Sequence, residues 1–332
     1  MKAVFFHGKD FPLVVKETYK PIPSAKQVLV RLKNAALNRR DLWIIKEQAN
    51  HFKDGIILGS DGSGVVEAVG EEAQQTWIGK EVVINPSYNW GNNPFVQGDS
   101  FKILGFPDAG TFAEYIAVPQ EHVFEKPAHL SFPEAASLPL SGLTAYRALF
   151  SKARLRRGEK VLVTGVGGST GYWALQLALA FEAIVYVTAG TDDKIAKAIA
   201  AGATGGFNYN IEGWIKDASK KANGFDVIID GAAGPQFGQL LELARPGARV
   251  VLYGRTSGNI EGIIPRSVFF KQLTISGTMM GTRDEFLSLI DFVEKHQLRP
   301  AIDKTFSLDN TADALEYLDT QNRFGKVVLT VE

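Results

Sequence analysis

The stretch Val161-Leu-Val-Thr-Gly165-Val-Gly167-Gly168-Ser169-Thr170-Gly171 decides the fold of this 332-residue chain. Branched apolar residues come first, small residues follow, and the segment from Tyr172 to Ala180 is then apolar almost throughout. This order predicts a buried strand, a tight turn and a buried helix.

The glycines of this turn are spaced G-x-x-G-x-x-G, a variant of G-x-G-x-x-G. Backbone N–H groups of such a turn can bind a pyrophosphate together with the helix N-terminus. The alternative is a plain tight turn between a strand and a helix. We expect a dinucleotide-binding turn, whose binding residues are Gly165, Gly168, Ser169, Thr170 and Gly171.

The segment from about 125 to 278 alternates between short apolar runs and helix-length stretches. Parallel neighbouring strands need crossover connections, which usually contain helices, so the alternation predicts a doubly wound parallel sheet. The expected strands are Lys160 to Thr164, Ala183 to Thr188, Gly206 to Tyr209, Phe225 to Asp230, Ala248 to Tyr253 and Leu273 to Ser276.

Residues 1 to 124 differ, because short β-type runs are broken by Gly, Pro and Asn. The runs predict an antiparallel, barrel-like domain. Residues 279 to 332 hold one amphipathic helix, Glu285 to Lys295, and a last strand, Lys326 to Val331, which is too little to fold alone. We expect this segment to complete the first domain, leaving residues 125 to 278 inserted in it. The expected strands of the first domain are Val28 to Leu32, Gly64 to Val69, Glu81 to Ile84 and Glu114 to Val118.

Composition narrows the class of partner. Lys plus Arg and Asp plus Glu both total 36, so no charge excess points to nucleic acid or to an anionic membrane. No segment is long and apolar enough for a membrane span, and the N-terminus has no signal pattern. Cysteine is absent, which excludes disulfides and sulfur-bound zinc. We expect a soluble, cytoplasmic protein that acts on a small-molecule substrate.

The end of the second strand of the sheet bears on the choice of coenzyme. An NAD site commonly has an acidic residue there, about 20 positions after the turn, which would repel a 2′-phosphate. Here Thr188 and Gly190 are neutral, and Lys194 follows where its ammonium can meet a phosphate. Asp192 and Asp193 leave NADH as an alternative coenzyme, although acidic residues are also favourable at the start of a helix. We expect NADPH.

Several further motifs follow one another in a fixed order. They are Ala36-Leu-Asn-Arg-Arg-Asp41, Gly59-Ser-Asp-Gly-Ser-Gly-Val-Val-Glu-Ala-Val-Gly70, Gly110-Thr-Phe-Ala-Glu-Tyr115, Leu138-Pro-Leu-Ser-Gly-Leu-Thr-Ala-Tyr146, Pro246-Gly-Ala-Arg-Val-Val251 and Phe324-Gly-Lys-Val-Val-Leu329. With the glycine turn, they make nearly the whole chain resemble the medium-chain dehydrogenase/reductase superfamily, and specifically its zinc-free, quinone-oxidoreductase-like branch. The resemblance implies an α/β protein with a GroES-like β-barrel catalytic domain, an inserted Rossmann domain and a homodimer.

The resemblance also locates the metal positions of zinc-dependent relatives, where a Cys, a His and another Cys or Asp bind the catalytic zinc. The matching residues here are Asn38, Ser60 and Leu140, a set that would not hold zinc. The segment from Asn85 to Phe106 matches the structural zinc loop of the family and has no cysteine. We expect neither metal.

Site residues are carried over from the same resemblance. Asn38 and Thr278 are expected near the nicotinamide, and Thr144 is expected to contact that ring. Lys194 and Tyr209 match positions that hold the adenosine phosphate end in NADPH-using relatives. Arg255 is either a coenzyme contact or a plain surface arginine.

Without a metal, the oxyanion that develops during hydride transfer must be met by hydrogen-bond donors, for which Asn38, Arg39 and Ser60 are candidates. Tyr88 or solvent is a candidate proton source; Asp41 and Asp61 are others, unless they serve local backbone. The aromatic residues Trp43, Tyr88 and Trp90 are candidates for a flat wall against the substrate, and loop packing is the alternative for the group Tyr88-Asn89-Trp90.

The expected function is therefore zinc-independent, NADPH-dependent transfer of a hydride to a quinone, an enone or another activated carbonyl compound. Two alternatives stay open. One is a zinc-type alcohol dehydrogenase, and the other is a nicotinamide-binding protein without catalytic activity.

Overall fold

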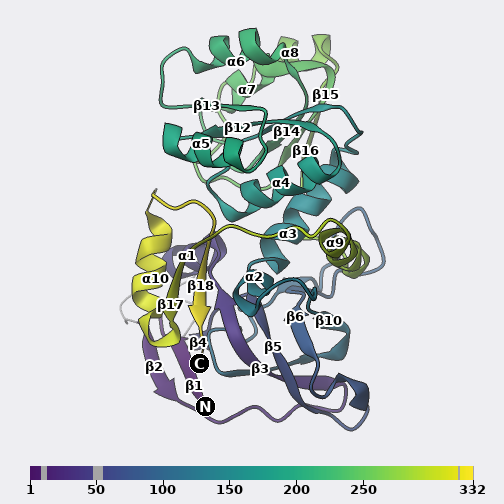
Figure 1. Cartoon of the computed structure of the whole chain (residues 1–332), viewed down its shortest axis with the longest axis vertical. Coiled ribbons are helices and arrows are strands. Elements are labelled where there is room, and N and C mark those ends of the chain that lie inside the picture. Colours follow the sequence, from purple (N-terminus) through teal and green to yellow (C-terminus); the bar gives the residue numbers. More distant parts are fainter. Residues whose placement is uncertain (9–12, 48–54, 321, 332) are drawn as a thin grey trace. The chain divides into compact units, whose positions relative to one another are not determined.

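The computed structural model describes residues 1–8, 13–47, 55–320 and 322–331. The chain forms two compact units, unit 1 (Met1–Leu140 with Gly281–Glu332) and unit 2 (Ser141–Met280). Unit 2 is one continuous segment inserted between the two parts of unit 1, as the colours of Figure 1 show. Among the described residues no helix is long and apolar enough to span a membrane.

Unit 2 is built on a six-stranded sheet in the order β13-β12-β11-β14-β15-β16. Every neighbouring pair is parallel, which confirms the predicted doubly wound arrangement. Most strands lie within one residue of their predicted bounds, but β15 begins at Ala244, four residues before the predicted Ala248. The strands are β11 (Lys160–Val163), β12 (Ile184–Ala189), β13 (Gly205–Asn208), β14 (Phe225–Asp230), β15 (Ala244–Leu252) and β16 (Thr274–Gly277).

Helices connect these strands and cover the sheet. Trp173, on the helix after the glycine turn, is fully buried, as is Phe237 on a later helix. Leu162, Ile228 and Val250 come from three adjacent strands and share one core with Phe237. The helices are α3 (Pro139–Tyr146), continued by a π-helical turn (Arg147–Lys152), α4 (Ser169–Ala180), α5 (Asp192–Ala200), α6 (Trp214–Ala222), α7 (Phe237–Leu243) and α8 (Pro265–Phe270).

Unit 1 contains the predicted antiparallel strands. Its main sheet runs β10-β6-β5-β3-β18-β17, and β9 pairs with β3 outside this path. A three-stranded sheet has the order β2-β1-β4, and a short pair joins β7 and β8. The strands are β1 (Lys2–Phe6), β2 (Val14–Glu17), β3 (Gln27–Ala36), β4 (Ile56–Ile57), β5 (Asp61–Val69), β6 (Glu81–Ile84), β7 (Ser87–Tyr88), β8 (Lys102–Ile103), β9 (Tyr115–Pro119), β10 (Val123–Glu125), β17 (Ile302–Ser307) and β18 (Lys326–Thr330).

The last part of the chain returns to unit 1. Strand β18 pairs antiparallel with β3, with Val328 opposite Ala36. The predicted helix near residue 285 is α9 (Arg283–Lys295), which begins in a capping box between Thr282 and Glu285. Short 3₁₀ turns lie at Gln75–Trp77, Gln120–His122 and Leu308–Asn310. The other helices of unit 1 are α1 (Arg39–Glu47), α2 (Phe132–Ala136) and α10 (Thr311–Asp319).

Candidate functional site

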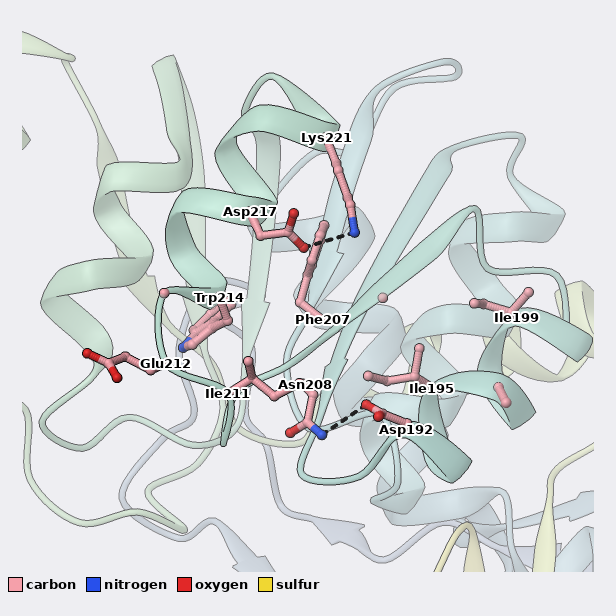
Figure 2. A pocket seen from close by; sticks show the side chains of 13 residues that line it. Asp192, Ile195, Ile199, Phe207, Asn208, Ile211, Glu212, Trp214, Asp217 and Lys221 are labelled. Atoms are coloured by element: carbon pink, nitrogen blue, oxygen red, sulfur yellow. Dashed lines mark hydrogen bonds and ion pairs between the residues drawn. The ribbon is translucent and has the colours of Figure 1, made fainter.

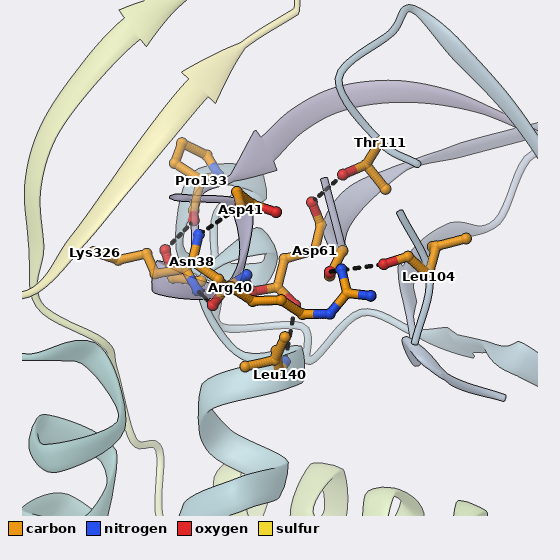
Figure 3. Close-up of polar contacts among 11 residues, drawn as sticks. Asn38, Arg40, Asp41, Asp61, Leu104, Thr111, Pro133, Leu140 and Lys326 are labelled. Carbon is orange, nitrogen blue, oxygen red and sulfur yellow. Dashed lines mark hydrogen bonds and ion pairs between the residues drawn. The ribbon is translucent and has the colours of Figure 1, made fainter. Parts of the chain in front are cut away.

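A buried polar cluster lies in unit 1 where three strands meet. Asn38 follows β3, Asp61 begins β5 and Lys326 begins β18. The Nζ atom of Lys326 lies 2.7 Å from Oδ1 of Asn38 and 2.7 Å from Oδ2 of Asp61. Figure 3 shows the three side chains pointing toward one another. We call Asn38, Asp61 and Lys326 the lysine cluster.

The lysine cluster fixes the orientation of the Asn38 amide. An ammonium group only donates hydrogen bonds and an ionised carboxylate only accepts them. Lys326 therefore donates to Oδ1 of Asn38, while Nδ2 of Asn38 donates to Oδ2 of Asp61 at 2.9 Å. The backbone N–H of Leu140 donates to the other carboxylate oxygen, Oδ1 of Asp61, at 2.8 Å. The amide keeps a second N–H hydrogen that these contacts do not use.

Asp41 supports the cluster from α1. Its Oδ2 accepts the backbone N–H of Asn38 at 2.7 Å, which fixes the chain where β3 ends. Its Oδ1 has no hydrogen-bond partner among the described residues. Burial raises the pKa of Asp41 to about 6, because the charged carboxylate is desolvated there. This local role agrees with the alternative in which Asp41 serves backbone.

The residues that match the zinc ligands of the family do not fit a metal. Oδ1 of Asn38 already accepts from an ammonium group. The hydroxyl of Ser60 donates to the carbonyl oxygen of Leu104 at 2.7 Å, and Leu140 has an alkyl side chain. Across the described ranges, no group of three or more His, Cys, Asp or Glu side chains is placed to bind a metal. The ammonium group of Lys326 lies beside Asn38 instead.

Two arginines follow Asn38, and they differ in environment. The side chain of Arg39, a predicted catalytic residue, is exposed. Arg40 is turned inward: it donates to the carbonyl of Phe106 at 2.9 Å and lies 3.5 Å from the Ser60 hydroxyl. Sequence reasoning did not single out Arg40 or Lys326. The quoted motif Phe324-Gly-Lys-Val-Val-Leu329 contained the signal for Lys326, because a lysine that begins a buried strand needs a partner.

Tyr88 lies in another part of unit 1. Its ring stacks on His122, with 3.9 Å between ring centroids. Burial raises its pKa well above the ordinary value, so the phenol is a weak acid. Trp90 packs edge-on against Phe101, which is the loop-packing interpretation of this residue. Tyr88 as the proton source stays a prediction.

The glycine turn of unit 2 combines a left-handed backbone position with a close approach between the turn and the helix that follows it. Gly165 adopts a φ of +62°, and a Cβ on Gly171 would lie 2.8 Å from the carbonyl oxygen of Gly165. Helix α4 begins after Gly168, and no side chain caps it. Its first-turn N–H groups, which include those of Ser169 and Thr170, have no partner within the helix. Dinucleotide binding by these residues stays a prediction.

The end of β12 gathers the residues predicted for the adenosine end. A Cβ on Gly190 would lie 2.8 Å from the hydroxyl of Tyr209, so the two residues are in close approach. Thr191 caps α5 by accepting the N–H of Lys194 at 3.4 Å. Thr188 is buried, and its hydroxyl oxygen accepts the N–H of Gly165 at 3.2 Å, which ties the glycine turn to β12.

Asp192 and Asp193, the two acidic residues that left NADH as an alternative coenzyme, both have side-chain partners. Oδ1 of Asp192 accepts from Asn208 at 2.9 Å, and Asp193 pairs with Lys197 at 2.8 Å. Asp192 also lines a pocket of about 460 Å³ beside β13, shown in Figure 2. Another carboxylate of that pocket, Asp217, pairs with Lys221 at 2.9 Å.

The remaining predicted residues lie elsewhere in unit 2. Thr144 is on α3 and is buried, whereas Arg255 is exposed beyond the end of β15. Thr278 follows β16, and its backbone N–H donates to the carbonyl of Leu252 at 2.8 Å. The hydroxyl of Thr278 is buried and has no hydrogen-bond partner among the described residues, and its place near the nicotinamide stays a prediction.

Comparison with known proteins identifies the family. Residues 24–128 match the family of alcohol dehydrogenase GroES-like domains, and residues 169–295 match the family of zinc-binding dehydrogenases. The chain belongs to the medium-chain dehydrogenase/reductase superfamily. Within this superfamily it is an oxidoreductase, and the GroES-like and Rossmann-like domains predicted from sequence are confirmed.

Similar members of the medium-chain superfamily carry different names. A zinc-type alcohol dehydrogenase-like protein of Leptosphaeria maculans is 32% identical over 97% of this chain and 95% of its own length. The quinone oxidoreductase of Homo sapiens is 29% identical over 98% of this chain and 95% of its own. A crystal structure of an NAD-dependent alcohol dehydrogenase is 35% identical, with a TM-score of 0.95 and full coverage of both chains. These matches show the family. They do not determine the substrate, which has to be inferred from the residues of the site.

Proposed function

We propose that this oxidoreductase is a metal-independent, NADPH-dependent reductase of quinones, enones or other activated carbonyl compounds. The observation that carries the proposal is the position of Lys326. Its ammonium group binds both Asn38, at a position matching a zinc ligand, and Asp61, which follows another such position, Ser60. A buried cation already balanced by a carboxylate would disfavour a second, metallic cation beside it.

The coenzyme proposal is supported by the end of β12. A 2′-phosphate needs a cation and the absence of a free carboxylate. Lys194 and Tyr209 lie at this end of the strand, while Asp192 and Asp193 are engaged by Asn208 and Lys197. NADPH is therefore preferred over NADH in this proposal.

The residues of unit 1 have defined parts in the proposed reaction. Reduced nicotinamide, when bound, supplies the hydride. Lys326 and Asp61 hold the Asn38 amide in one orientation, and its remaining N–H donates to the substrate oxygen as negative charge develops there. The hydroxyl of Ser60 is occupied by Leu104, so it is not assigned as a donor.

This donor set favours a particular class of acceptor. An amide N–H polarises a carbonyl less strongly than a metal ion does. Quinones and α,β-unsaturated carbonyl compounds delocalise the incoming charge themselves, and therefore need less polarisation. Simple ketones are expected to be poor substrates.

Steady-state kinetics test the proposal. We would compare kcat/KM for 1,4-benzoquinone, an enone and cyclohexanone, each with NADPH and with NADH. The expected order is quinone and enone far above cyclohexanone, with NADPH preferred by about tenfold or more. In Lys194→Ala the KM for NADPH should rise and the KM for NADH should stay constant. A clear preference for NADH, or for cyclohexanone, would contradict the proposal.

Zinc-type alcohol dehydrogenase activity is the second candidate, favoured by the name of the 32% identical relative. Oxidation of an unactivated alcohol that depends on added zinc would establish it. The side chains at Asn38, Ser60 and Leu140 disfavour zinc binding. Carboxamide and hydroxyl oxygens are weak zinc ligands, and the leucine side chain has no atom that can bind zinc.

We also propose that the protein is a homodimer. Strand β16 lies at the edge of the unit 2 sheet, so its outer backbone groups can pair with a second copy. Phe269 and Phe270, on the preceding helix α8, are 62% and 66% exposed. Light scattering of the full chain should give the mass of a dimer, and Phe270→Lys should shift it toward the monomer.

A further inference from the structure

Arg40 lies beside the lysine cluster and is turned into unit 1. Its side chain is half-buried, and its Nη2 donates to the carbonyls of Phe106 at 2.9 Å and Ile103 at 3.3 Å. Its Nη1 lies 3.5 Å from the hydroxyl of Ser60. Figure 3 shows the guanidinium group turned away from Lys326. Among the described residues, this cation therefore contacts only neutral oxygen atoms.

The absence of a carboxylate contact among the described residues distinguishes Arg40 from half-buried arginines of unit 2. Arg245 pairs with Asp226 at 3.0 Å, and Arg249 pairs with Glu159 at 2.5 Å. Burial lowers the pKa of Arg40, because its guanidinium is desolvated. The group nevertheless stays charged at neutral pH. A desolvated charge is normally paired, so Arg40 has room for an anionic partner from outside the described chain.

The nearby carboxylates are used by other groups. Oδ2 of Asp41 accepts the backbone N–H of Asn38 at 2.7 Å, and its Oδ1 has no hydrogen-bond partner among the described residues. Asp61 pairs with Lys326 at 2.7 Å. Both carboxylates still repel a highly charged anion that approaches Arg40. A singly charged carboxylate is therefore favoured over a phosphate, which carries up to about two negative charges at neutral pH.

The guanidinium of Arg40 has N–H donors left for such an anion. It carries more N–H groups than its contacts with Phe106, Ile103 and Ser60 use. Its Nε has no hydrogen-bond partner among the described residues and is not fully buried, so a ligand can reach it. Hydrogen bonds between a guanidinium and a carboxylate are charge-assisted and belong to the strong ones in proteins.

Arg40 is also close to the proposed oxyanion donor. Its guanidinium contacts Ser60, and the next residue, Asp61, accepts from the Asn38 amide at 2.9 Å. One small substrate can therefore place its carbonyl oxygen at Asn38 and an anionic substituent at Arg40. Contacts at both ends would fix the orientation of the substrate.

We propose that Arg40 is a substrate-binding residue, which selects acceptors that carry a carboxylate close to the reducible carbonyl group. This inference rests on the reductase function proposed above. The substrate carboxylate accepts a hydrogen bond from Nε of Arg40, while the carbonyl oxygen accepts from Nδ2 of Asn38. The carboxylate takes no part in hydride transfer. The preferred acceptors are then quinone or enone carboxylates, and neutral quinones are secondary substrates.

The test compares 1,4-benzoquinone-2-acetate with its methyl ester, in which the charge is removed and the quinone ring is unchanged. With NADPH, kcat/KM of the parent should be at least tenfold higher for the carboxylate. In Arg40→Met it should fall at least tenfold for the carboxylate and stay within about threefold for the ester. Arg40→Lys keeps a cation and should retain part of the preference.

Arg283→Met is the matched control. Arg283 is an exposed arginine of unit 1 that also donates to a backbone carbonyl, that of Glu121 at 3.1 Å. This variant should keep the preference of the parent for the carboxylate. Equal kcat/KM for the two quinones in the parent, or a preference that survives in Arg40→Met, would overturn the proposal.

A binding measurement separates this proposal from the reductase function. The full chain, with NADP⁺ in excess, is titrated calorimetrically with 4-hydroxyphenylacetate and with its neutral amide. The carboxylate should bind the parent at least tenfold more tightly than the amide does, and the two should bind Arg40→Met alike. If the parent reduces neither quinone, the reductase function fails. Equal binding of the two probes to the parent, or no binding of the carboxylate, would then overturn the part given to Arg40 as well.

Discussion

The Nζ atom of Lys326 lies 2.7 Å from Oδ2 of Asp61, with 1% of the lysine side chain and 0% of the aspartate side chain exposed. The pair joins the first residue of β18 to the first residue of β5, which are 265 positions apart in sequence. Removal of one partner from such a buried pair leaves the other charge buried and uncompensated, which destabilises the structure around it. The orientation of Asn38, and with it the proposed oxyanion donor, depends on the pair.

Lys326→Met should destabilise the protein by about 3–5 kcal/mol, because it leaves the Asp61 carboxylate buried without its cation. Urea denaturation followed by circular dichroism gives the free energy of unfolding. The double variant Lys326→Met/Asp61→Asn should recover part of the loss, since no uncompensated charge remains. Strictly additive losses would show that the two side chains are not coupled.

Asn38→Ala should lower kcat by about 100-fold, the usual effect of removing one oxyanion donor. The Kd for NADPH should stay within about twofold, because the phosphate-binding turn lies in unit 2. Asn34→Ala is the matched control: Asn34 is also a buried asparagine, it lies within β3, and its side-chain amide donates to the carbonyl of Leu329 at 3.0 Å. It should lose stability and keep kcat. If both variants lose kcat equally, Asn38 has no special part in turnover.

Asp41 gives a pH dependence of stability with a defined sign. Folding raises its pKa to about 6 from 3.8, so the folded state binds this proton more tightly than the unfolded state. The resulting contribution is fully present below about pH 3.8 and is lost as pH rises through about 6. Asp41→Asn lacks this titration and keeps an acceptor for the N–H of Asn38.

The free energy of unfolding of the parent should therefore fall relative to that of Asp41→Asn, by roughly 1 kcal/mol between pH 5 and pH 7.5. His122, whose pKa is lowered to about 4, acts in the opposite direction, but it is common to both proteins and cancels. Parallel curves across this range would show that Asp41 is not titrating there.

Gly171→Ala tests the close approach of α4 to the glycine turn. The added Cβ would lie 2.8 Å from the carbonyl oxygen of Gly165, so the turn must shift. The Kd for NADPH should rise at least tenfold, measured by coenzyme fluorescence. Gly277→Ala in β16 is the control, because nothing lies within 4 Å of its Cβ. Unchanged affinity in Gly171→Ala would remove the turn from the coenzyme site.

The fold was largely predictable because its signals are local. The apolar run before Gly165 and the small residues after it determine β11, the turn and α4 within a short stretch of chain. The amphipathic segment from Glu285 to Lys295 was also correctly predicted as a helix, although one of its apolar residues, Leu287, is 43% exposed.

The site was less predictable because its contacts are not local. Nothing near Lys326 in sequence indicates that it meets Asn38 and Asp61, since the contact requires the pairing of β18 with β3. Ser60 was a reasonable donor by residue type, but its hydroxyl is used by a carbonyl from another loop. Tyr88 and His122 are 34 positions apart, and their stacking follows from the packing of unit 1.

The central claim is that Lys326, and not a metal ion, supplies the positive charge of this site. The most direct measurement is the rate of NADPH oxidation with 1,4-benzoquinone after exhaustive dialysis against EDTA, repeated after zinc is added back. We predict that the rate is the same before dialysis, after it and with added zinc. Loss of the rate on dialysis, followed by recovery with stoichiometric zinc, would contradict the account.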